Sequence, residues 1–360
     1  MPKRVDFADD LHLGICEVSE VLVQNVWLIW FLLVVCLGVI GYAGYKLCYY
    51  GDVIAQISGL SRTWVGLVLL ATVTSLPELV SGLSAVTVAQ VPDIAVGSVM
   101  GSCVFNLLLI VVLDLLYRKE SIFTRARLGN VVSAGYRIAL IGFVGFNLLF
   151  YRDAGVPALG HVGWYTPLLV LLYALALRSL YRYELQQVPD AAPDDSPELA
   201  SLTLGAVMGR YLVAASAVVL TSLLLPFVAE ALAKAMQWQQ SFVGTLFVAA
   251  ITSAPEVAVT LAALRMGSVD MAIGNLFGSN LFNMVILAVD DLAYLPGPLF
   301  SDVSIAHAVS AFSAMMMSGV AVVGLIMRPV SKAFRTVSWI SLLLFAIYIL
   351  NTLFMYLHDH

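Results

Sequence analysis

The same polar motif occurs twice in this chain, each time inside a long apolar stretch. One copy reads Thr-Ser-Leu-Pro-Glu and ends at Glu78; the other reads Thr-Ser-Ala-Pro-Glu and ends at Glu256. Each is followed by Gly-Ser-x-x-Phe-Asn, ending at Asn106 and at Asn283. A glutamate at the centre of a membrane span costs at least about 2.5 kcal/mol. The chain therefore places an energetically unfavourable glutamate in both copies of the motif.

The composition predicts an all-α polytopic membrane protein. Of the 360 residues, 61% are hydrophobic and 11% are charged, and the mean hydropathy is +0.94. Because a membrane helix needs about 20 apolar residues, we expect ten transmembrane helices. They lie at residues 24–50, 64–87, 94–117, 131–151, 163–183, 203–235, 241–264, 271–289, 304–327 and 336–357.

A Pro- and Asp-rich segment divides these helices into two sets of five. We expect an N-terminal extramembrane segment at 1–23, a first five-helix repeat at 24–183, a linker at 184–202 and a second repeat at 203–360. Because five is odd, the second repeat enters the membrane inverted relative to the first. Inverted repeats with a site near the midplane are typical of secondary transporters.

The basic residues predict the orientation. With the N-terminus outside, fourteen of the 18 Lys and Arg residues fall on the inner side, and only Lys3, Arg4, Arg152 and Lys234 fall outside. Cytoplasmic loops are enriched in Lys and Arg. We therefore expect both termini outside and a cytoplasmic linker, with the protein in the plasma (inner) membrane.

Each glutamate shares a helix face with hydroxyl groups, because residues at i, i+3, i+4 and i+7 align. A proline before each glutamate cannot donate to the carbonyl four residues back, so it kinks the helix and loosens backbone oxygens. Hard oxygen ligands of this kind suit Ca²⁺ and Na⁺. The aligned sets are Ala71, Thr74, Ser75 and Glu78 with Pro77, and Ala249, Thr252, Ser253 and Glu256 with Pro255.

The helix after each glutamate helix carries a polar stripe beside a Gly-x-x-x-Gly pair. Such pairs let membrane helices approach closely, which would bring each stripe towards the glutamates. The stripes are Ser98, Ser102 and Asn106, and Asn275, Ser279 and Asn283; the glycine pairs are Gly97/Gly101 and Gly274/Gly278.

Other polar residues in the spans favour structural roles. Asp114 and Asp291 correspond across the repeats and lie at span ends, where we expect capping or interfacial solvation. His307 fits a packed residue better than a proton relay. The chain has no His-Glu-x-x-His, Gly-x-Ser-x-Gly or P-loop motif, so we expect neither an enzyme nor an ATP-driven pump.

The repeated motifs resemble those of the cation/Ca²⁺ exchanger superfamily, whose sodium/calcium exchanger membrane region has two inverted halves of five spans. The Thr-Ser-x-Pro-Glu form is most similar to its prokaryotic Na⁺/Ca²⁺ exchanger branch. The resemblance covers both motif regions and the span count. It implies that Glu78 and Glu256 are central carboxylates shared between Ca²⁺ and Na⁺, with Asn106 and Asn283 completing the centre.

The resemblance also implies a set of flanking ligands. Their side chains are Thr74, Ser75, Ser102, Thr252, Ser253 and Ser279, and the carbonyls of Ala71 and Ala249 line outer sites. One departure matters: some relatives carry Asp where this chain has Asn283. Two carboxylates balance one Ca²⁺ but leave less negative charge for several Na⁺ ions, and Asn283 also argues mildly against K⁺ co-transport.

These observations predict an antiporter that moves Ca²⁺ against Na⁺ by alternating access. Its partners would be these ions and the lipid bilayer, with no cofactor and no nucleic acid. The alternative is a Ca²⁺/H⁺ antiporter, or one for another divalent cation, that protonates the same glutamates. A channel is disfavoured because an inverted pair in one chain does not build a symmetric pore.

The topology leads to a first prediction. Single cysteines at Ala192 and Gly155, in a cysteine-free background, should react with a membrane-impermeant maleimide from opposite sides of the membrane. The reason is that the Lys and Arg bias places the linker inside and the 152–161 loop outside. Labelling of both from one side would refute the inverted arrangement.

Overall fold

The protein is described by a computed structural model that covers residues 25–118, 120–151, 158–186, 203–236, 251–329 and 337–358. It is helical apart from one two-stranded hairpin, β1 (Ala158–Leu159) with β2 (Val162–Gly163). The helices of the first half are α2 (Val26–Ser58), α3 (Arg62–Trp64), η1 (Val65–Leu70), α4 (Ala71–Ser84), η2 (Ala85–Ala89), α5 (Pro92–Leu116), α6 (Ile122–Arg125), α7 (Leu128–Phe150) and α8 (Tyr165–Leu185). Those of the second half are α10 (Leu204–Ala235), α12 (Ala254–Arg265), α13 (Val269–Ala293), η3 (Leu299–Ser301), α14 (Ala306–Met327) and α15 (Trp339–His358).

The expected all-helical membrane architecture is confirmed. In the described residues, eight helices are long and apolar enough to cross a membrane, counting the continuous run Arg62–Ala89 as one. The other two predicted spans correspond to α8, which carries Arg178, Arg182 and Glu184 near its end, and to α12. The α12 span was predicted from 241, and residues 241–250 lie outside the described part.

The first helix is longer than the sequence suggested. The apolar stretch ended at 50, but α2 continues to Ser58 and ends at Gly59, whose φ of 69° suits a glycine C-cap. Asp52, in this extension, forms an ion pair with Arg62 at the start of α3. The helix therefore continues beyond its apolar part, because its charged residue has a partner at the membrane edge.

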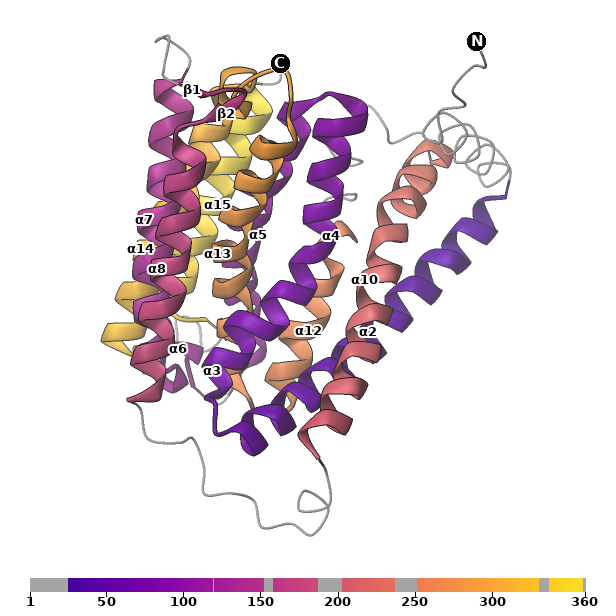
Figure 1. The fold of residues 1–360 in the computed structure, drawn as a ribbon. Helices are drawn as coiled ribbons and strands as arrows, with labels where there is room; N and C mark the ends of the chain where they lie inside the picture. The colour runs from indigo at the N-terminus through magenta and orange to yellow at the C-terminus, as the bar shows by residue number, and fades with distance from the viewer. Residues whose placement is uncertain are drawn as a thin grey trace.

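The two halves run in opposite directions (Figure 1). The first half starts with α2 descending from the upper side of the view, and α8 ends at the lower side. The second half starts there with α10 ascending, and α15 ends at the upper side. Helices α5 and α13 occupy corresponding positions, and they lie against each other in the middle of the bundle.

Burial separates the centre of the bundle from its edge. In α13, 83% of the most apolar 18-residue window is buried, against 28% in α2 and 39% in α10. Helices α2 and α10 pack mainly on each other, along one edge of the bundle. The repeated motifs on α4, α5, α12 and α13 are therefore central, and the two long first helices flank them.

Two buried aspartates hold the ends of the central helices. Asp114 near the end of α5 accepts hydrogen bonds from the backbone N–H groups of Ile122 (2.9 Å) and Ser338 (2.7 Å) and from the hydroxyls of Ser121 and Ser341. It is fully buried. Asp114 therefore joins α5 to the start of α15, in the other half.

Asp291, its counterpart on α13, is equally buried. It accepts from the N–H groups of Leu299 (2.7 Å) and Gly163 (2.9 Å) and from the hydroxyls of Tyr165 and Thr166. The capping expected for both aspartates is observed, but neither is solvated at the interface. Each carboxylate gains enough donors to offset its desolvation.

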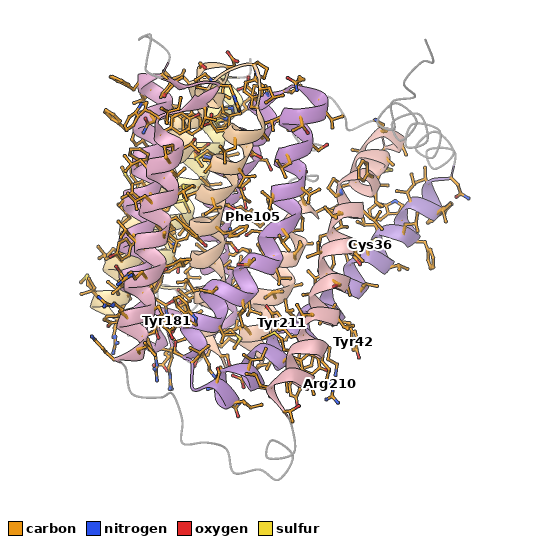
Figure 2. The ribbon with its side chains drawn as sticks, in the orientation of Figure 1. Cys36, Tyr42, Phe105, Tyr181, Arg210 and Tyr211 are labelled. Atoms are coloured by element: carbon orange, nitrogen blue, oxygen red, sulfur yellow. The ribbon has the colours of Figure 1, made fainter. Side chains whose placement is uncertain are left out.

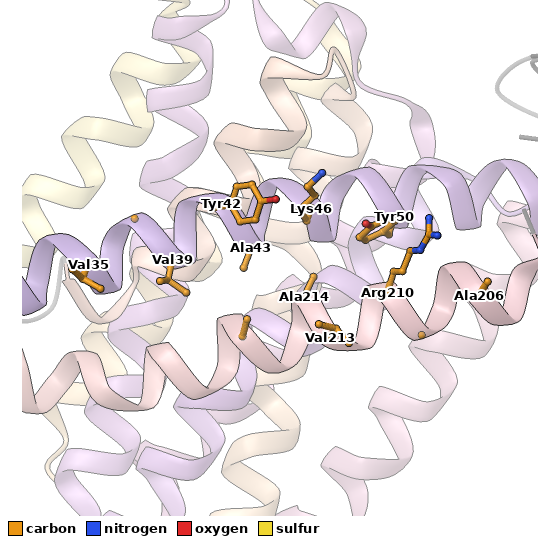
Figure 3. A pocket seen from close by; sticks show the side chains of 13 residues that line it. Val35, Val39, Tyr42, Ala43, Lys46, Tyr50, Ala206, Arg210, Val213 and Ala214 are labelled. Atoms are coloured by element: carbon orange, nitrogen blue, oxygen red, sulfur yellow. The ribbon is translucent and has the colours of Figure 1, made fainter. Parts of the chain in front are cut away.

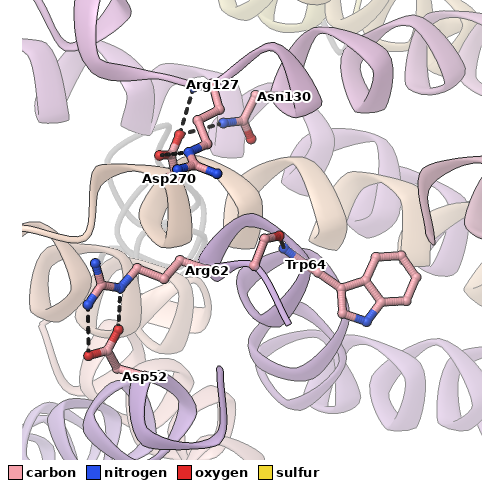
Figure 4. A network of polar contacts seen from close by, with 7 residues as sticks. Asp52, Arg62, Trp64, Arg127, Asn130 and Asp270 are labelled. Carbon is pink, nitrogen blue, oxygen red and sulfur yellow. Dashed lines mark hydrogen bonds and ion pairs between the residues drawn. The ribbon is translucent and has the colours of Figure 1, made fainter. Parts of the chain in front are cut away.

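A second pair of aspartates anchors the opposite ends. Asp270 in the first turn of α13 accepts from the N–H of Arg127 (2.8 Å) and from Asn130 Nδ2 (3.1 Å), as Figure 4 shows. The same arrangement occurs 177 residues away. Asp93 in the first turn of α5 accepts from the N–H of Ser304 (2.6 Å) and bonds His307 Nε2 (2.9 Å).

His307 thus occupies the place of Asn130 in the other repeat. Its ring is buried and bonded to the carboxylate that starts α5. This supports the packed role expected for His307 over a proton relay. Both aspartates also lie at helix N-termini, where the helix dipole favours negative charge.

These anchors give a stability prediction. Asp291→Asn turns an amide N–H₂ towards groups that are themselves donors, so at least one buried donor loses its acceptor. We expect a loss of about 3 kcal/mol of folding stability, measured as earlier thermal aggregation in detergent by size-exclusion chromatography. Asp302→Asn is the control, because this exposed carboxylate accepts only from Tyr294 among the described residues. Equal melting of the two variants would contradict the anchoring role.

Candidate functional site

The two glutamates lie on differently shaped helices. In the first repeat, α4 passes through Pro77 without a break and follows the π-helical segment η1. Such segments are frequent at functional sites. In the second repeat, Ser253 leaves the helical conformation with ψ at 10°, and α12 begins at Ala254.

Pro255 therefore lies in the first turn of α12, just after Ser253 interrupts the helical conformation of residues 251–252. Proline fits this position because a first-turn N–H has no intrahelical acceptor. Glu256 follows in the same first turn. Its carboxylate consequently lies at the positive end of a helix dipole, unlike that of Glu78.

Glu78 on α4 and Glu256 on α12 lie near each other where the repeats meet, and Thr74 lies beside Glu256. Glu256 is only 1% exposed. Among the described residues, both its oxygens and Oε2 of Glu78 are buried without a hydrogen-bond partner. Glu78 itself is half-buried. Buried carboxylate oxygens without compensation are unstable, so a cation or a proton would stabilise this pair.

Thr74 connects the first glutamate helix to the polar stripe of the other repeat. Its hydroxyl lies 3.2 Å from Ser279 Oγ and 3.5 Å from Asn275 Oδ1, and it donates to the carbonyl of Ala71 at 3.3 Å. Asn275 in turn donates to Thr260. The stripe on α13 therefore faces the hydroxyl-bearing side of α4.

The two motif asparagines each bond a residue of the other repeat, across the contact of α5 with α13. Asn106 Nδ2 donates to Asn280 Oδ1 at 2.9 Å, and Asn280 Nδ2 donates to the carbonyl of Cys103 at 2.9 Å. Asn283 Nδ2 lies 3.5 Å from Cys103 Sγ. These bonds hold the amide nitrogens of Asn106 and Asn283 and leave their carbonyl oxygens available.

Asn280 is a residue that the sequence analysis did not single out. It is fully buried and corresponds to Cys103 in the other repeat, so the two equivalent positions bond each other. Its position in the Gly-Ser-Asn-x-x-Asn run could have pointed to it. Because the first repeat has cysteine at the equivalent position, Asn280 does not stand out when only residues shared by both repeats are considered.

Within the described residues of the two repeated motifs, the buried side-chain atoms without a partner are all oxygens. They are Ser75 Oγ, Glu78 Oε2, Asn106 Oδ1, Asn283 Oδ1 and both oxygens of Glu256. The same part of the chain contains no group of three or more His, Cys, Asp or Glu side chains placed to hold a metal ion. The cluster therefore offers two carboxylates and several neutral oxygens, which suits a hard cation.

The remaining predicted residues are distributed as follows. Ser253 and Ser279 are buried, whereas Ser102 and Thr252 are half-buried. Ala71 presents its carbonyl to Thr74, and Ala249 lies outside the described residues. The structure therefore brings together Glu78, Glu256, Thr74 and Ser279 most directly.

Close packing of α13 against the first repeat depends on glycine. A Cβ at Gly278 would overlap the carbonyl oxygen of Leu67, and one at Gly274 would lie 2.7 Å from the carbonyl oxygen of Thr63. A Cβ at Gly66, on the opposing helix, would overlap the carbonyl of Met271. The Gly-x-x-x-Gly pair on α13 therefore marks a close backbone contact, as predicted.

Comparison with known proteins identifies the family. The sequence profile described as sodium/calcium exchanger protein matches residues 28–181 and again residues 206–357. The chain belongs to the sodium/calcium exchanger protein family. It is accordingly a membrane cation exchanger with two family repeats and not an enzyme.

Individual relatives agree with this membership. The chain is 28% identical over 272 residues to Inner membrane protein YrbG of Escherichia coli (strain K12), which covers 74% of this chain and 80% of that protein. Its fold matches a solved structure of the sodium-calcium exchanger NCX_Mj soaked with 2.5 mM Na⁺ and 0.1 mM Sr²⁺. The TM-score is 0.68 at 20% identity, with 90% of this chain and 98% of that chain covered.

This sodium/calcium exchanger family member also buries an arginine behind its motif asparagines. Arg137 on α7 is fully buried, donates from Nε to Ser318 Oγ at 2.9 Å, and places its guanidinium 3.8 Å from the ring centre of Phe277. The positive-inside interpretation places Arg137 on the inner side, but the residue lies inside the bundle. Its contact with the aromatic face offsets part of the cost of burial.

A lateral groove of about 760 Å³ separates the lower parts of α2 and α10 (Figure 3). Its walls are apolar apart from Tyr42, Lys46, Tyr50 and Arg210. Figure 2 shows Tyr42 and Arg210 at the edge of the bundle. No residue of the glutamate cluster lines this groove, so the groove and the cluster are separate features.

The glycine contact gives a matched pair of variants. Gly278→Ala forces α13 away from η1, so we expect about 3 kcal/mol or more of destabilisation and loss of transport. Gly101 is the equivalent residue on α5; it is exposed, and no described atom lies within 4 Å of a Cβ there. Gly101→Ala should therefore retain a normal size-exclusion profile. Similar profiles for both variants would refute the close contact.

Proposed function

We propose that this protein exchanges Ca²⁺ for Na⁺ across the membrane by alternating access, with both ions bound at Glu78 and Glu256. The observation that carries the proposal is the pair of neighbouring carboxyl groups whose buried oxygens lack partners among the described residues, located where two inverted repeats meet. Membership in the exchanger family supports the same assignment.

The charge of the cluster fits one Ca²⁺. Two ionised glutamates supply −2, and Ca²⁺ takes six to eight oxygens. We assign the additional oxygens to Asn106, Asn283 and Ser75, whose unpartnered atoms are buried. Thr74, Ser102, Thr252, Ser253 and Ser279, with the carbonyls of Ala71 and Ala249, are the flanking ligands in this proposal.

Charge neutralisation couples the two fluxes. An empty cluster carries two buried charges, and moving it past an apolar barrier costs several kcal/mol per ion. Binding of either Ca²⁺ or Na⁺ removes most of that cost. Only the ion-bound protein therefore switches readily between the two sides of the membrane. Ca²⁺ is carried in one direction and Na⁺ in the other.

We assign the change of access to α2 and α10. These helices are long and mostly exposed to the surroundings, and they pack chiefly on each other. Among the described residues, Gly38 and Gly41 have no neighbours within 4 Å of a Cβ, whereas Gly44 lies against Val259 of α12. This loose packing supports sliding of the helix pair over the core.

The proposed orientation places the upper side of Figure 1 outside the cell. This follows from the Lys and Arg bias, which gathers basic residues at the ends of α8 and α12 and at the start of α3. YrbG, a similar protein, is named as an inner membrane protein. We propose the same membrane here, with both termini outside and the linker cytoplasmic.

A Ca²⁺/H⁺ exchanger is the second candidate. The feature that favours it is the proximity of Glu78 to Glu256, because two neighbouring carboxyl groups can share one proton. A proton could then replace Na⁺ as the neutralising ion. The same glutamates serve both candidates, so the driving gradient distinguishes them.

Uptake of ⁴⁵Ca²⁺ into proteoliposomes tests both the function and the site. An imposed outward Na⁺ gradient should drive uptake, and a pH gradient alone should not. Glu78→Gln and Glu256→Gln should each reduce uptake at least about a hundredfold, since a charge pair at 4 Å contributes about 4 kcal/mol at an effective dielectric of 20.

Glu120→Gln is the control, because this residue pairs with Arg125 at the membrane edge. It should transport normally. Uptake driven only by the pH gradient would replace Na⁺ by H⁺ in the proposal. Wild-type rates in either glutamine variant would remove that glutamate from the site.

A further inference from the structure

Asp290 is a buried carboxylate that the exchange mechanism does not use. It lies near the end of α13, its exposed fraction is 0%, and among the described residues neither oxygen has a hydrogen-bond partner. The adjacent Asp291 is equally buried but receives four hydrogen bonds. The end of α13 therefore carries one carboxylate with hydrogen-bond donors, Asp291, and one without a described donor, Asp290, which we call the bare carboxylate.

The bare carboxylate lies against the glutamate helix. A Cβ at Gly82 of α4 would be 2.5 Å from Asp290 Oδ2 and 2.9 Å from Oδ1, so the carboxyl group occupies the space that glycine leaves. Gly82 follows Glu78 by four residues and shares its helix face. Asp290 is thus about one turn, or about 6 Å along α4, from the level of Glu78, towards the upper end.

The local electrostatics favour a cation beside Asp290. The last turn of a helix carries a partial negative charge, which repels a carboxylate. No ion pair joins Asp290 to a Lys, Arg or His in the described residues. A bound cation would remove both penalties, and buried carboxylates inside membrane helices commonly mark ion pathways.

The unpartnered carboxylate occurs at only one end of the bundle among the described residues. The residue equivalent to Asp290 in the first repeat is Leu113, at the lower end of α5, and it is 1% exposed. The anchoring aspartates, by contrast, occur in both repeats. Asp290 is therefore an asymmetric addition to a symmetric framework, on the upper side alone.

We propose that Asp290, with the last turn of α13 and the outer part of α4, forms an accessory cation site through which Ca²⁺ reaches Glu78 and Glu256 from the upper side. The inference rests on the proposed function and extends it. The accessory carboxylate raises the local concentration of cations at one entrance only, so it affects affinity from one side of the membrane.

Side-specific transport tests this inference. Exchange of ⁴⁵Ca²⁺ is measured in right-side-out and in everted membrane vesicles that contain wild-type protein or Asp290→Asn. We expect the half-saturating Ca²⁺ concentration to rise about tenfold at the outer face and to stay unchanged at the inner face. Asp290 loses no hydrogen bond in this variant, so the size-exclusion profile should match the wild type.

Two further variants separate a local effect from general surface charge. Gly82→Ala displaces the Asp290 carboxyl group and should also weaken Ca²⁺ activation from the outer face. Asp302→Asn removes an exposed carboxylate on the same side and should change neither face. Superimposable curves for wild type and Asp290→Asn would mean that Asp290 holds a proton permanently, and they would overturn the proposal. Equal shifts at both faces would overturn it as well.

A binding measurement makes the test independent of transport. In detergent, Glu78→Gln/Glu256→Gln protein should retain weak equilibrium binding of ⁴⁵Ca²⁺, and adding Asp290→Asn should abolish it. No residual binding, or residual binding unaffected by Asp290→Asn, would refute the accessory site. A wild-type protein without any Ca²⁺ exchange would refute the proposed function, while the binding arm would still decide the role of Asp290.

Discussion

The cost of burying a carboxylate in an apolar bundle organises this structure. Helices α4, α5, α12 and α13 contain seven acidic residues. Four of them, Asp93, Asp114, Asp270 and Asp291, receive two or more hydrogen bonds from neighbouring segments. The other three are Glu78, Glu256 and Asp290, and they leave buried oxygens unpartnered. The hydrogen bonds of each carboxylate therefore separate the four anchors from the three carboxylates that we propose as cation ligands.

Carboxylates with hydrogen-bond donors and carboxylates without them have different roles in this bundle. The anchors fix the ends of α5 and α13, so the polar stripes on these helices keep a constant register relative to the glutamates. Within that frame, Asn280 holds Asn106 and the Cys103 carbonyl, and Thr74 faces Ser279. A rigid surround lets the uncompensated pair remain ready for an ion without collapsing onto other donors.

Much of this arrangement could be predicted from the sequence, because it depends on the spacing of residues along helices and on the duplicated motif. Apolar runs located the spans, the duplicated motif paired the halves, and the glycine spacing of Gly274 and Gly278 predicted a close helix contact that is present. Other features depend on which segments meet in space. Pro255 starts a helix, Arg137 is enclosed by α13 and α14, and Asp290 differs from Asp291 only in its neighbours. One sequence contains no signal for such contacts.

The anchors also bear on how the chain is made. Asp93 receives its donors from Ser304 and His307, and Asp270 receives its donors from Arg127 and Asn130. Asp114 and Asp291 likewise depend partly on the opposite half. During synthesis, the N-terminal half leaves the ribosome before the groups that complete it exist. Its helices can insert, but Asp93 and Asp114 obtain their donors from the second half only after that half has been made.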